Sequence, residues 1–156
     1  MLRKILRLFR SHPKPPPRPA DPRLAADPWL ARIFALLGDR YQLGPDSPEG
    51  ARVLRRTGRA RFNPMPIWLR AAERSVRCEY EVRGDAAAAR TLLDARVSGR
   101  LLPLGLGVAS ESVEEWAGTV LTRRYEGRCD SPESAAAAVR FVCQESETQV
   151  NLAAEG

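Results

Sequence analysis

Residues 75–84, SVRCEYEVRG, decide the fold class of this chain. Charged residues alternate there with four apolar ones, Val76, Cys78, Tyr80 and Val82. A period of two is the pattern of a β-strand that buries one face and wets the other. Strands of this kind are typical of antiparallel sheets, because such sheets commonly keep one solvated face.

After this strand the sequence predicts a mixture of helices and strands. Caps, turn residues and apolar periodicity place the boundaries. The predicted elements are a helix from Asp85 to about Val97, an irregular stretch over 100–110 that partly pairs as a strand, a strand over 115–126 (EWAGTVLTRRYE), a helix from Ser131-Pro132-Glu133 to about Gln144, and a short edge strand over 148–152.

The hexapeptide at 80–85, YEVRGD, resembles YEGRCD at 125–130. In both places a strand is predicted to end and an alanine-rich helix to follow. Two such β-α units predict an α+β fold, with helices packed on one face of a small antiparallel sheet. A ferredoxin-like or a split βαβ arrangement fits this pattern.

Residues 25–74 are predicted to be a helical N-terminal half of the same domain, which we expect to span 25–152. Asp27-Pro28 is a helix start, and Gly38 is placed to end that helix. Ser47-Pro48-Glu49 repeats the start signal for a helix to about Thr57, and a short third helix is expected near Pro66. The predicted core consists of Trp29, Phe34, Trp68, Val76, Tyr80, Leu92, Trp116, Val120 and Val142.

The first residues, MLRKILRLFR, form a basic amphipathic pattern. Leu2, Ile5, Leu6 and Phe9 fall on one side of a helix, and the other side carries Arg3, Lys4, Arg7 and Arg10. A proline-rich linker follows at 13–24. We expect residues 1–12 to be a docking helix for a membrane surface or a partner protein. The alternatives are packing on its own domain, disorder, or mitochondrial targeting.

The formal charge of +6 is unevenly distributed. Residues 1–74 hold 16 basic and 6 acidic residues (+10), and residues 75–156 hold 9 and 13 (−4). On the helix predicted after Ser47, an arginine ridge at spacings of three and four offers an anion-binding surface for nucleic acid. A solvated helix face is the favoured interpretation, because only two of the cations are lysine and arginine richness can reflect codon usage. The ridge consists of Arg52, Arg55, Arg56 and Arg59, with Arg61 just beyond.

The sequence contains no recognisable catalytic set. The single histidine, His12, lies in the linker, and the cysteines (Cys78, Cys129 and Cys143) have no metal-ligand spacing. Glu111, Glu114 and Glu115 fit a polar loop before a strand better than an acid–base pair. We expect no metal, no cofactor and no small-molecule substrate, and an odd number of cysteines favours a reducing compartment.

Together these features favour a non-enzymatic intracellular adaptor or regulatory protein. It is expected to be cytoplasmic, and peripheral to a membrane if the N-terminal helix binds lipid. Its partner would be a protein or an anionic membrane surface. The second hypothesis is a nucleic-acid-associated protein or ribonucleoprotein component that uses the arginine ridge.

Overall fold

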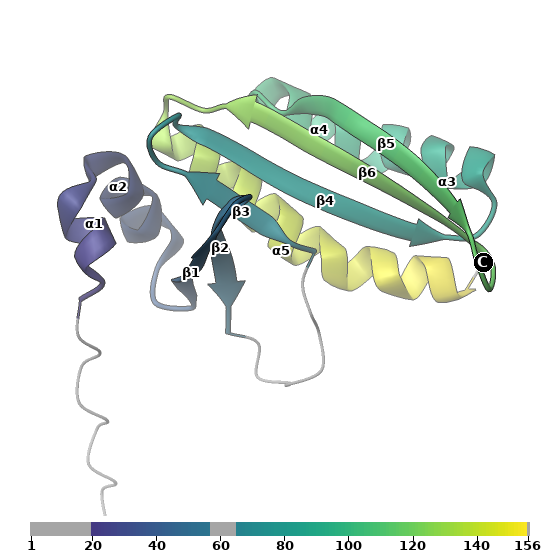
Figure 1. Cartoon of the computed structure of the whole chain (residues 1–156), viewed down its shortest axis with the longest axis horizontal. Helices are drawn as coiled ribbons and strands as arrows, with labels where there is room; N and C mark the ends of the chain where they lie inside the picture. The colour runs from purple at the N-terminus through teal and green to yellow at the C-terminus, as the bar shows by residue number, and fades with distance from the viewer. Residues whose placement is uncertain (1–19, 57–64, 156) are drawn as a thin grey trace, which may run out of the picture.

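The computed structural model describes residues 20–56 and 65–155, and the side chains of that part up to residue 144 (Figure 1). Its elements in chain order are α1 (Pro22–Ala26), α2 (Pro28–Leu37), β1 (Tyr41–Ser47), β2 (Gly50–Arg55), β3 (Ile67–Arg70), β4 (Ser75–Arg83), α3 (Ala86–Leu93), the π-helical turn η1 (Asp94–Ser98), α4 (Gly99–Leu101), the 3-10 turn η2 (Leu102–Leu104), β5 (Gly107–Glu115), β6 (Thr119–Arg128) and α5 (Pro132–Glu155).

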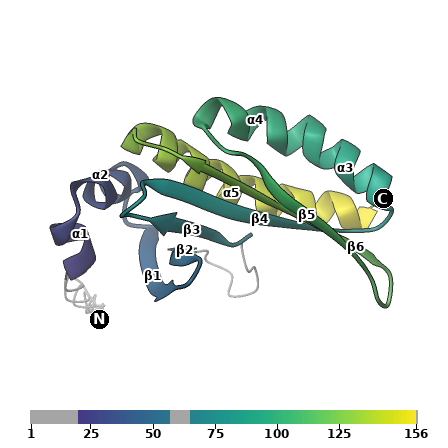
Figure 2. The ribbon, with the colours of Figure 1, turned by 45° about the horizontal axis from the view of Figure 1, so that its top comes forward.

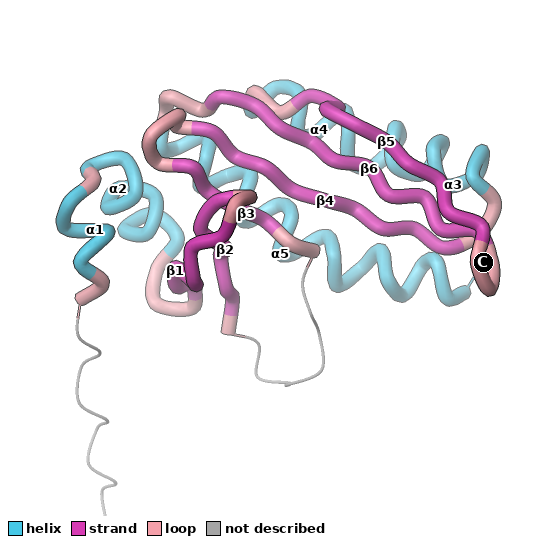
Figure 3. Tube along the Cα trace, viewed as in Figure 1, coloured by secondary structure: helices cyan, strands magenta, loops and turns pink. Residues whose placement is uncertain are grey.

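Within these residues, six strands form one antiparallel sheet in the order β1-β2-β3-β4-β6-β5 (Figure 3). The first four strands follow one another as a meander. The chain then crosses through α3, η1 and α4 to the far edge, where β5 begins. β6 returns between β5 and β4, so β4 and β5 run in the same direction on either side of it. The prediction of an α+β fold with an antiparallel sheet is confirmed.

Helices α3, α4 and α5 lie on one face of this sheet, and none of the described helices covers the other, which we call the open face (Figure 2). The alternation of β4 explains the choice of face. Val76, Cys78 and Tyr80 are fully buried under the helices, whereas Arg77 and Glu79 point to the open face. On β6 the residues that share the buried face include Leu121, Arg123 and Tyr125.

The helix predicted after Asp27 is confirmed as α2. The Asp27 carboxylate accepts hydrogen bonds from the backbone N–H groups of Trp29 and Leu30, which caps the first turn. Gly38 ends the helix with a φ of 85°, a conformation that favours glycine. The indole of Trp29 donates to the Cys129 carbonyl at 2.8 Å, which ties α2 to the segment between β6 and α5.

The helices predicted over 47–57 and near Pro66 are wrong, because these residues form β1, β2 and β3. Ser47 closes a turn: its hydroxyl accepts from the Glu49 N–H and donates to the Gly50 carbonyl. Gly50 has a φ of 127°, and a Cβ there would lie 2.8 Å from the Leu69 carbonyl oxygen. Only glycine fits, so the Ser-Pro-Glu signal marks a hairpin turn here and not a helix start.

The C-terminal half departs from prediction in three places. The strand expected over 115–126 is divided, because Ala117 and Gly118 have φ values of 54° and 114° and form a turn. Trp116 sits on this turn with 90% of its surface exposed, so its placement in the core was wrong. Helix α5 continues through 148–152, where an edge strand was expected, because no glycine or proline interrupts it.

The remaining core predictions hold to different degrees. Trp29, Phe34, Val76, Tyr80 and Val142 are buried, and Trp68, Leu92 and Val120 are half-buried. Helix α1 begins at Pro22, inside the stretch predicted to be linker, so regular structure starts a few residues earlier than expected.

Candidate functional site

The predicted docking residues lie outside the described part of the chain. These are Leu2, Arg3, Lys4, Ile5, Leu6, Arg7, Phe9 and Arg10. Two of the predicted anion-binding residues, Arg59 and Arg61, lie in the undescribed range 57–64. The docking role therefore stays a prediction.

The other three arginines do not form the expected ridge, because they lie on β2 and just after it. Arg52 shares the open face with its cross-strand neighbour Trp68. Arg55 points to the opposite face, where its Nη1 donates to the Cys143 carbonyl of α5 at 3.3 Å. Arg56 follows the strand with an exposed side chain. A helical ridge is thus absent, while anion binding by any single arginine stays a prediction.

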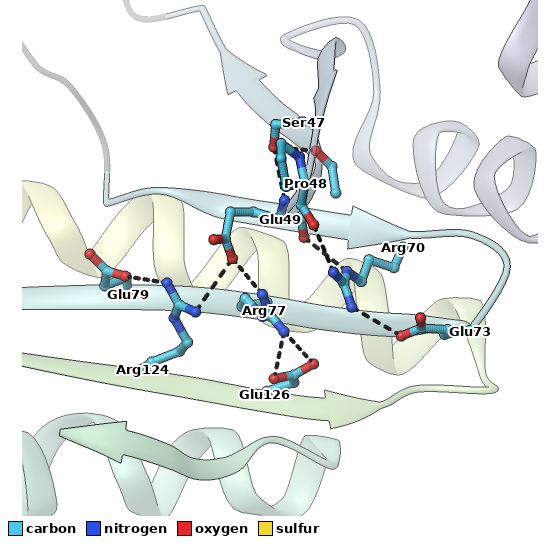
Figure 4. Close-up of polar contacts among 10 residues, drawn as sticks. Ser47, Pro48, Glu49, Arg70, Glu73, Arg77, Glu79, Arg124 and Glu126 are labelled. Atoms are coloured by element: carbon cyan, nitrogen blue, oxygen red, sulfur yellow. Dashed lines mark hydrogen bonds and ion pairs between the residues drawn. The ribbon is translucent and has the colours of Figure 1, made fainter.

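The open face of the sheet carries a network of ion pairs, which we name the open-face cluster (Figure 4). Two arginines from neighbouring strands are at its centre. Arg77 on β4 donates from Nη2 to both oxygens of Glu126, at 2.9 and 3.0 Å. Arg124 on β6 donates from Nη2 to Glu79 at 3.0 Å. The members are Glu49, Arg70, Glu73, Arg77, Glu79, Arg124 and Glu126.

Glu49 brings the tip of the β1–β2 hairpin onto this cluster. Its carboxylate accepts from Arg77 and lies 3.4 Å from Nη1 of Arg124. Arg70 adds two bonds from the other side, from Nη2 to the Pro48 carbonyl at 2.7 Å and from Nε to the Glu49 carbonyl at 3.2 Å. The hydrogen bond from Arg77, with the charges of Arg124 and Arg70, lowers the pKa of Glu49. The tip is therefore fixed by a carboxylate that stays ionised at neutral pH.

The open-face cluster contains more carboxylates than guanidinium groups. Three arginines (Arg70, Arg77 and Arg124) meet the four carboxylates of Glu49, Glu73, Glu79 and Glu126. A phosphate would have to displace an existing bidentate partner from Arg77, which costs the hydrogen bonds already made. This arrangement stabilises the hairpin on the sheet and does not favour an anion-binding surface.

A second charged group, the Arg123 cluster, lies on the helix face between β5, β6 and α3. The side chain of Arg123 is only 6% exposed. Its Nε donates to Glu111 at 2.8 Å and its Nη1 to Asp94 at 2.6 Å. Arg90 on α3 donates to the other oxygen of Glu111 at 2.6 Å. The bonds from Arg90 and Arg123 lower the pKa of Glu111. Burial opposes the charge of Arg123, but its bonds to Tyr125, Asp94 and Glu111 outweigh this and raise its pKa.

The π-helical turn η1 supplies two members of the Arg123 cluster. Asp94 and Ser98, at the two ends of the turn, both reach Nη1 of Arg123, and Ser98 Oγ lies 2.7 Å from the Tyr125 hydroxyl. Such turns occur often at functional sites. One signal in the sequence points to this cluster, namely an arginine at the same strand spacing as Leu121 and Tyr125, which places it on the buried face. Glu111, expected in a loop, lies on β5.

The turn between β5 and β6 borders a hollow of about 400 Å³. Trp116 and Gly118 of the turn line it together with Arg83 and Gly84 at the end of β4. Trp116 is the most exposed of the large apolar residues in the described part of the chain. The hollow and the exposed indole place an aromatic contact surface at one end of the sheet.

The three thiols are buried and free. Burial raises the pKa of Cys78, and burial together with the charge of Asp130 raises the pKa of Cys129 to about 11. Neither is a thiolate at neutral pH, so neither is an activated nucleophile. Among the described residues, no group of three or more histidine, cysteine, aspartate or glutamate side chains is placed to hold a metal ion.

No family model, curated protein or solved structure matches this chain. Of the helices in the described ranges, none is both long enough and apolar enough to cross a bilayer. Any functional proposal therefore rests on the residues of this chain and on the geometry of its described part.

Proposed function

We propose that the protein is an adaptor whose basic amphipathic segment, residues 1–12, docks on an anionic membrane surface or a partner protein. The observation that carries this proposal is that the described residues, which begin at residue 20, bury an apolar core of their own. The buried apolar core of the described residues runs from Trp29 to Cys143 and joins α2, the sheet, α3 and α5. A domain with its own core leaves the N-terminal segment available for attachment.

The point where the chain enters the domain is firmly held, which suits a tether. Arg23 on α1 donates from Nη1 to the Gly44 carbonyl at 2.7 Å and to Asp46 at 3.1 Å. Its Nη2 donates to Asp21 at 2.7 Å and to the Leu43 carbonyl at 3.3 Å. These bonds fix α1 to β1. A force applied to the N-terminal segment would therefore be transmitted to the sheet through the contacts of Arg23 with β1.

The chemistry of residues 1–12 indicates what the surface must offer. Burying Leu2, Ile5, Leu6 and Phe9 stabilises attachment by about 1.5–3 kcal/mol for each side chain that leaves water completely. The basic residues between them add attraction to anionic lipids or to an acidic protein groove. An apolar surface with anionic groups at its rim satisfies both requirements.

Flotation with liposomes tests the membrane form of the proposal. Full-length protein should float with anionic vesicles, and protein that lacks residues 1–12 should stay in the dense fraction. Ile5→Ser with Phe9→Ser should abolish flotation, whereas Arg3→Gln with Arg7→Gln should weaken it on anionic vesicles only. If the full-length protein floats with neither vesicle, the membrane is not its surface and the partner-protein form remains.

A melting curve of the deletion variant tests the separation of the two parts. The thermal midpoint should change by less than about 2 °C, because no described core contact is lost. A fall of several degrees would show that residues 1–12 belong to the fold, and the adaptor proposal would fail.

A nucleic-acid partner is the weaker proposal. The arginines of the open-face cluster are engaged by glutamates, and Arg55 is engaged with α5. Of the other predicted arginines, the structure describes Arg52 and Arg56. Binding through these two predicts an affinity that falls steeply with salt and weakens on charge reversal of either residue. Salt-insensitive binding would dispose of this alternative.

We also propose a split βαβ arrangement, of the ferredoxin-like kind, for the part from β3 onward. The support is the strand order β3-β4-β6-β5, with one helical segment between β4 and β5 and another after β6. The strand that usually ends this arrangement would here come first, as β3. For location we propose a reducing compartment, such as the cytoplasm, which the free thiols support.

A further inference from the structure

The two edges of the sheet differ in how they meet solvent. Edge strand β1 contains Pro45, which has no N–H to donate, and its register shifts between Leu43 and Asp46. The guanidinium of Arg23 also occupies the carbonyls of Leu43 and Gly44. These are the usual devices that block an edge against further pairing.

Edge strand β5 has few of these devices. It is nine residues long, contains no proline, and is exposed at every position after Gly107. Its register shifts once, between Val108 and Ser110, and then pairs regularly with β6 as far as Glu115. Within the described residues β6 is its only strand partner. The outer backbone groups of β5 are therefore available to another strand.

The side chains of β5 define what that strand must carry. Val108 and Val113 lie on the helix face and are 54% and 39% exposed. Ser110, Ser112 and Glu114 lie on the open face. An added strand would therefore place apolar side chains on one face and polar ones on the other, in alternation.

The charge along β5 is acidic and partly uncompensated. Glu111 is engaged by Arg90 and Arg123. In contrast, Glu114 and Glu115 make no ion pair with any residue that the structure describes. Carboxylates of this kind, beside a strand edge, are complementary to basic side chains on an incoming segment.

Trp116 continues the surface at the end of β5. Its indole is 90% exposed and borders the hollow beside Gly84. An aromatic face of this kind attracts a lysine or arginine side chain and also buries apolar area against it. The strand edge, the carboxylates and the indole therefore favour the same chemistry in a partner.

We propose that the β5 edge binds an extended segment of a partner protein by strand addition, and that this segment alternates basic with apolar residues. Main-chain hydrogen bonds to β5 would provide affinity, and the alternation would provide specificity. Strand β5 is not part of the N-terminal docking segment, so the protein would use two different segments to join two partners or surfaces.

Two short capped peptides test the proposal with the full-length protein. One alternates lysine with valine. The other carries the same charge with proline in place of each valine and a methyl group on the backbone nitrogen of each lysine, so none of its residues has an N–H to donate to the ladder. Only the lysine–valine peptide should bind, as measured by anisotropy of a labelled peptide. Hydrogen exchange should show slower exchange along 107–115 when it is bound. Equal binding of both peptides would reduce the effect to charge alone and overturn strand addition.

Two variants that change the net charge by the same amount test whether the peptide binds at β5. Glu114→Arg should weaken the lysine–valine peptide by about ten-fold or more, since it replaces attraction by repulsion. Asp39→Arg, an exposed position before β1, should change the affinity by less than about two-fold. Both variants alter exposed side chains, and melting curves will show that each is folded. Equal effects of the two variants would overturn the placement on β5.

Light scattering tests whether a second copy of the chain, and not a partner segment, pairs with the β5 edge. The full-length protein should be monomeric at the concentrations of the peptide experiment. A dimer that Glu114→Arg dissociates would show that a second copy covers β5, and the proposal of a basic partner segment would be wrong. Failure of both peptides to bind would overturn strand addition by such a segment. It would leave the adaptor proposal untouched, because flotation depends on residues 1–12 alone.

Discussion

Arg123 and Glu111 lie directly opposite each other in the β5–β6 ladder, joined by a hydrogen bond of 2.8 Å from Nε to Oε2. Arg123 is nearly inaccessible to solvent, whereas Asp94, its other acidic partner, is largely exposed. The pair fastens an otherwise exposed edge strand to α3 through Arg90. It therefore adds a side-chain attachment to the backbone ladder that holds β5 on β6.

Arg123→Met should destabilise the fold by about 2–4 kcal/mol. Breaking a buried ion pair costs about 3–5 kcal/mol, and the exposure of Asp94 reduces that cost. Urea unfolding measures the change. Arg83→Met is the matched control, since Arg83 is 82% exposed and its ion pair with Glu81 is at the distance limit. The control should stay within about 0.5 kcal/mol of the parent. Equal effects would show that the Arg123 cluster contributes nothing beyond a surface pair.

Acid should weaken the Arg123 cluster. The pKa of Glu111 in the folded protein lies below its ordinary value of 4.5, so the unfolded chain binds a proton more readily. The stabilisation from Glu111 is therefore complete above about pH 5 and is lost as the pH falls through the lowered pKa. In urea titrations at a series of pH values, the stability difference between the parent and Glu111→Gln should shrink below pH 4.5. A difference that stays constant down to pH 2 would contradict the assignment.

The tryptophans should report their environments separately. Trp116→Phe should leave the free energy of unfolding within about 0.5 kcal/mol of the parent and shift the emission maximum to the blue, because the exposed indole is removed. Trp29→Phe should cost about 1–3 kcal/mol, because it opens space in the core and leaves the Cys129 carbonyl without its donor. Iodide should quench the parent more strongly than Trp116→Phe. The opposite order would place the wrong indole in solvent.

Gly84 and Gly50 have nearly the same φ, so their alanine variants distinguish the cost of backbone strain from the cost of a steric clash. Gly84→Ala should cost about 1–3 kcal/mol from backbone strain alone, since its φ is 126° and no atom lies within 4 Å of the added Cβ. Gly50→Ala should cost more by about 1 kcal/mol or above, because its Cβ would meet the Leu69 carbonyl oxygen at 2.8 Å. Denaturant midpoints of the two variants test the difference. Equal losses would mean that the hairpin turn moves freely away from β3.

The elements that the sequence predicted correctly depend on neighbouring residues only. Strand β4 follows from the alternation at 75–83, and helices α2 and α3 follow from the caps at Asp27 and Asp85. Local signals of this kind hold unless tertiary contacts oppose them. The opening of α5 after Ser131 belongs to the same group.

The elements that were predicted wrongly depend on contacts across the chain. Ser47-Pro48-Glu49 fits a helix start or a turn equally well, and the proximity of Gly50 to the Leu69 carbonyl decides between them. The arginine spacing in 52–59 fits a helix, although the buried Ala51 and Val53 already alternate as in a strand. The Arg123 cluster was beyond prediction because the register that places Glu111 opposite Arg123 joins two strands through an exposed turn.

The ties at the tip of the β1–β2 hairpin have a mechanical consequence. β2 pairs with β3 over only two residues in the register, so backbone bonds alone join the first two strands weakly to the rest. Glu49 forms ion pairs with Arg77 and Arg124, and these join the hairpin directly to β4 and β6 without depending on the β2–β3 pairing. A force applied to the chain at Arg23 and β1 is therefore transmitted through Glu49 to β4 and β6, as well as through the short β2–β3 pairing. The β1–β2 hairpin should therefore move together with the central strands and not independently of them.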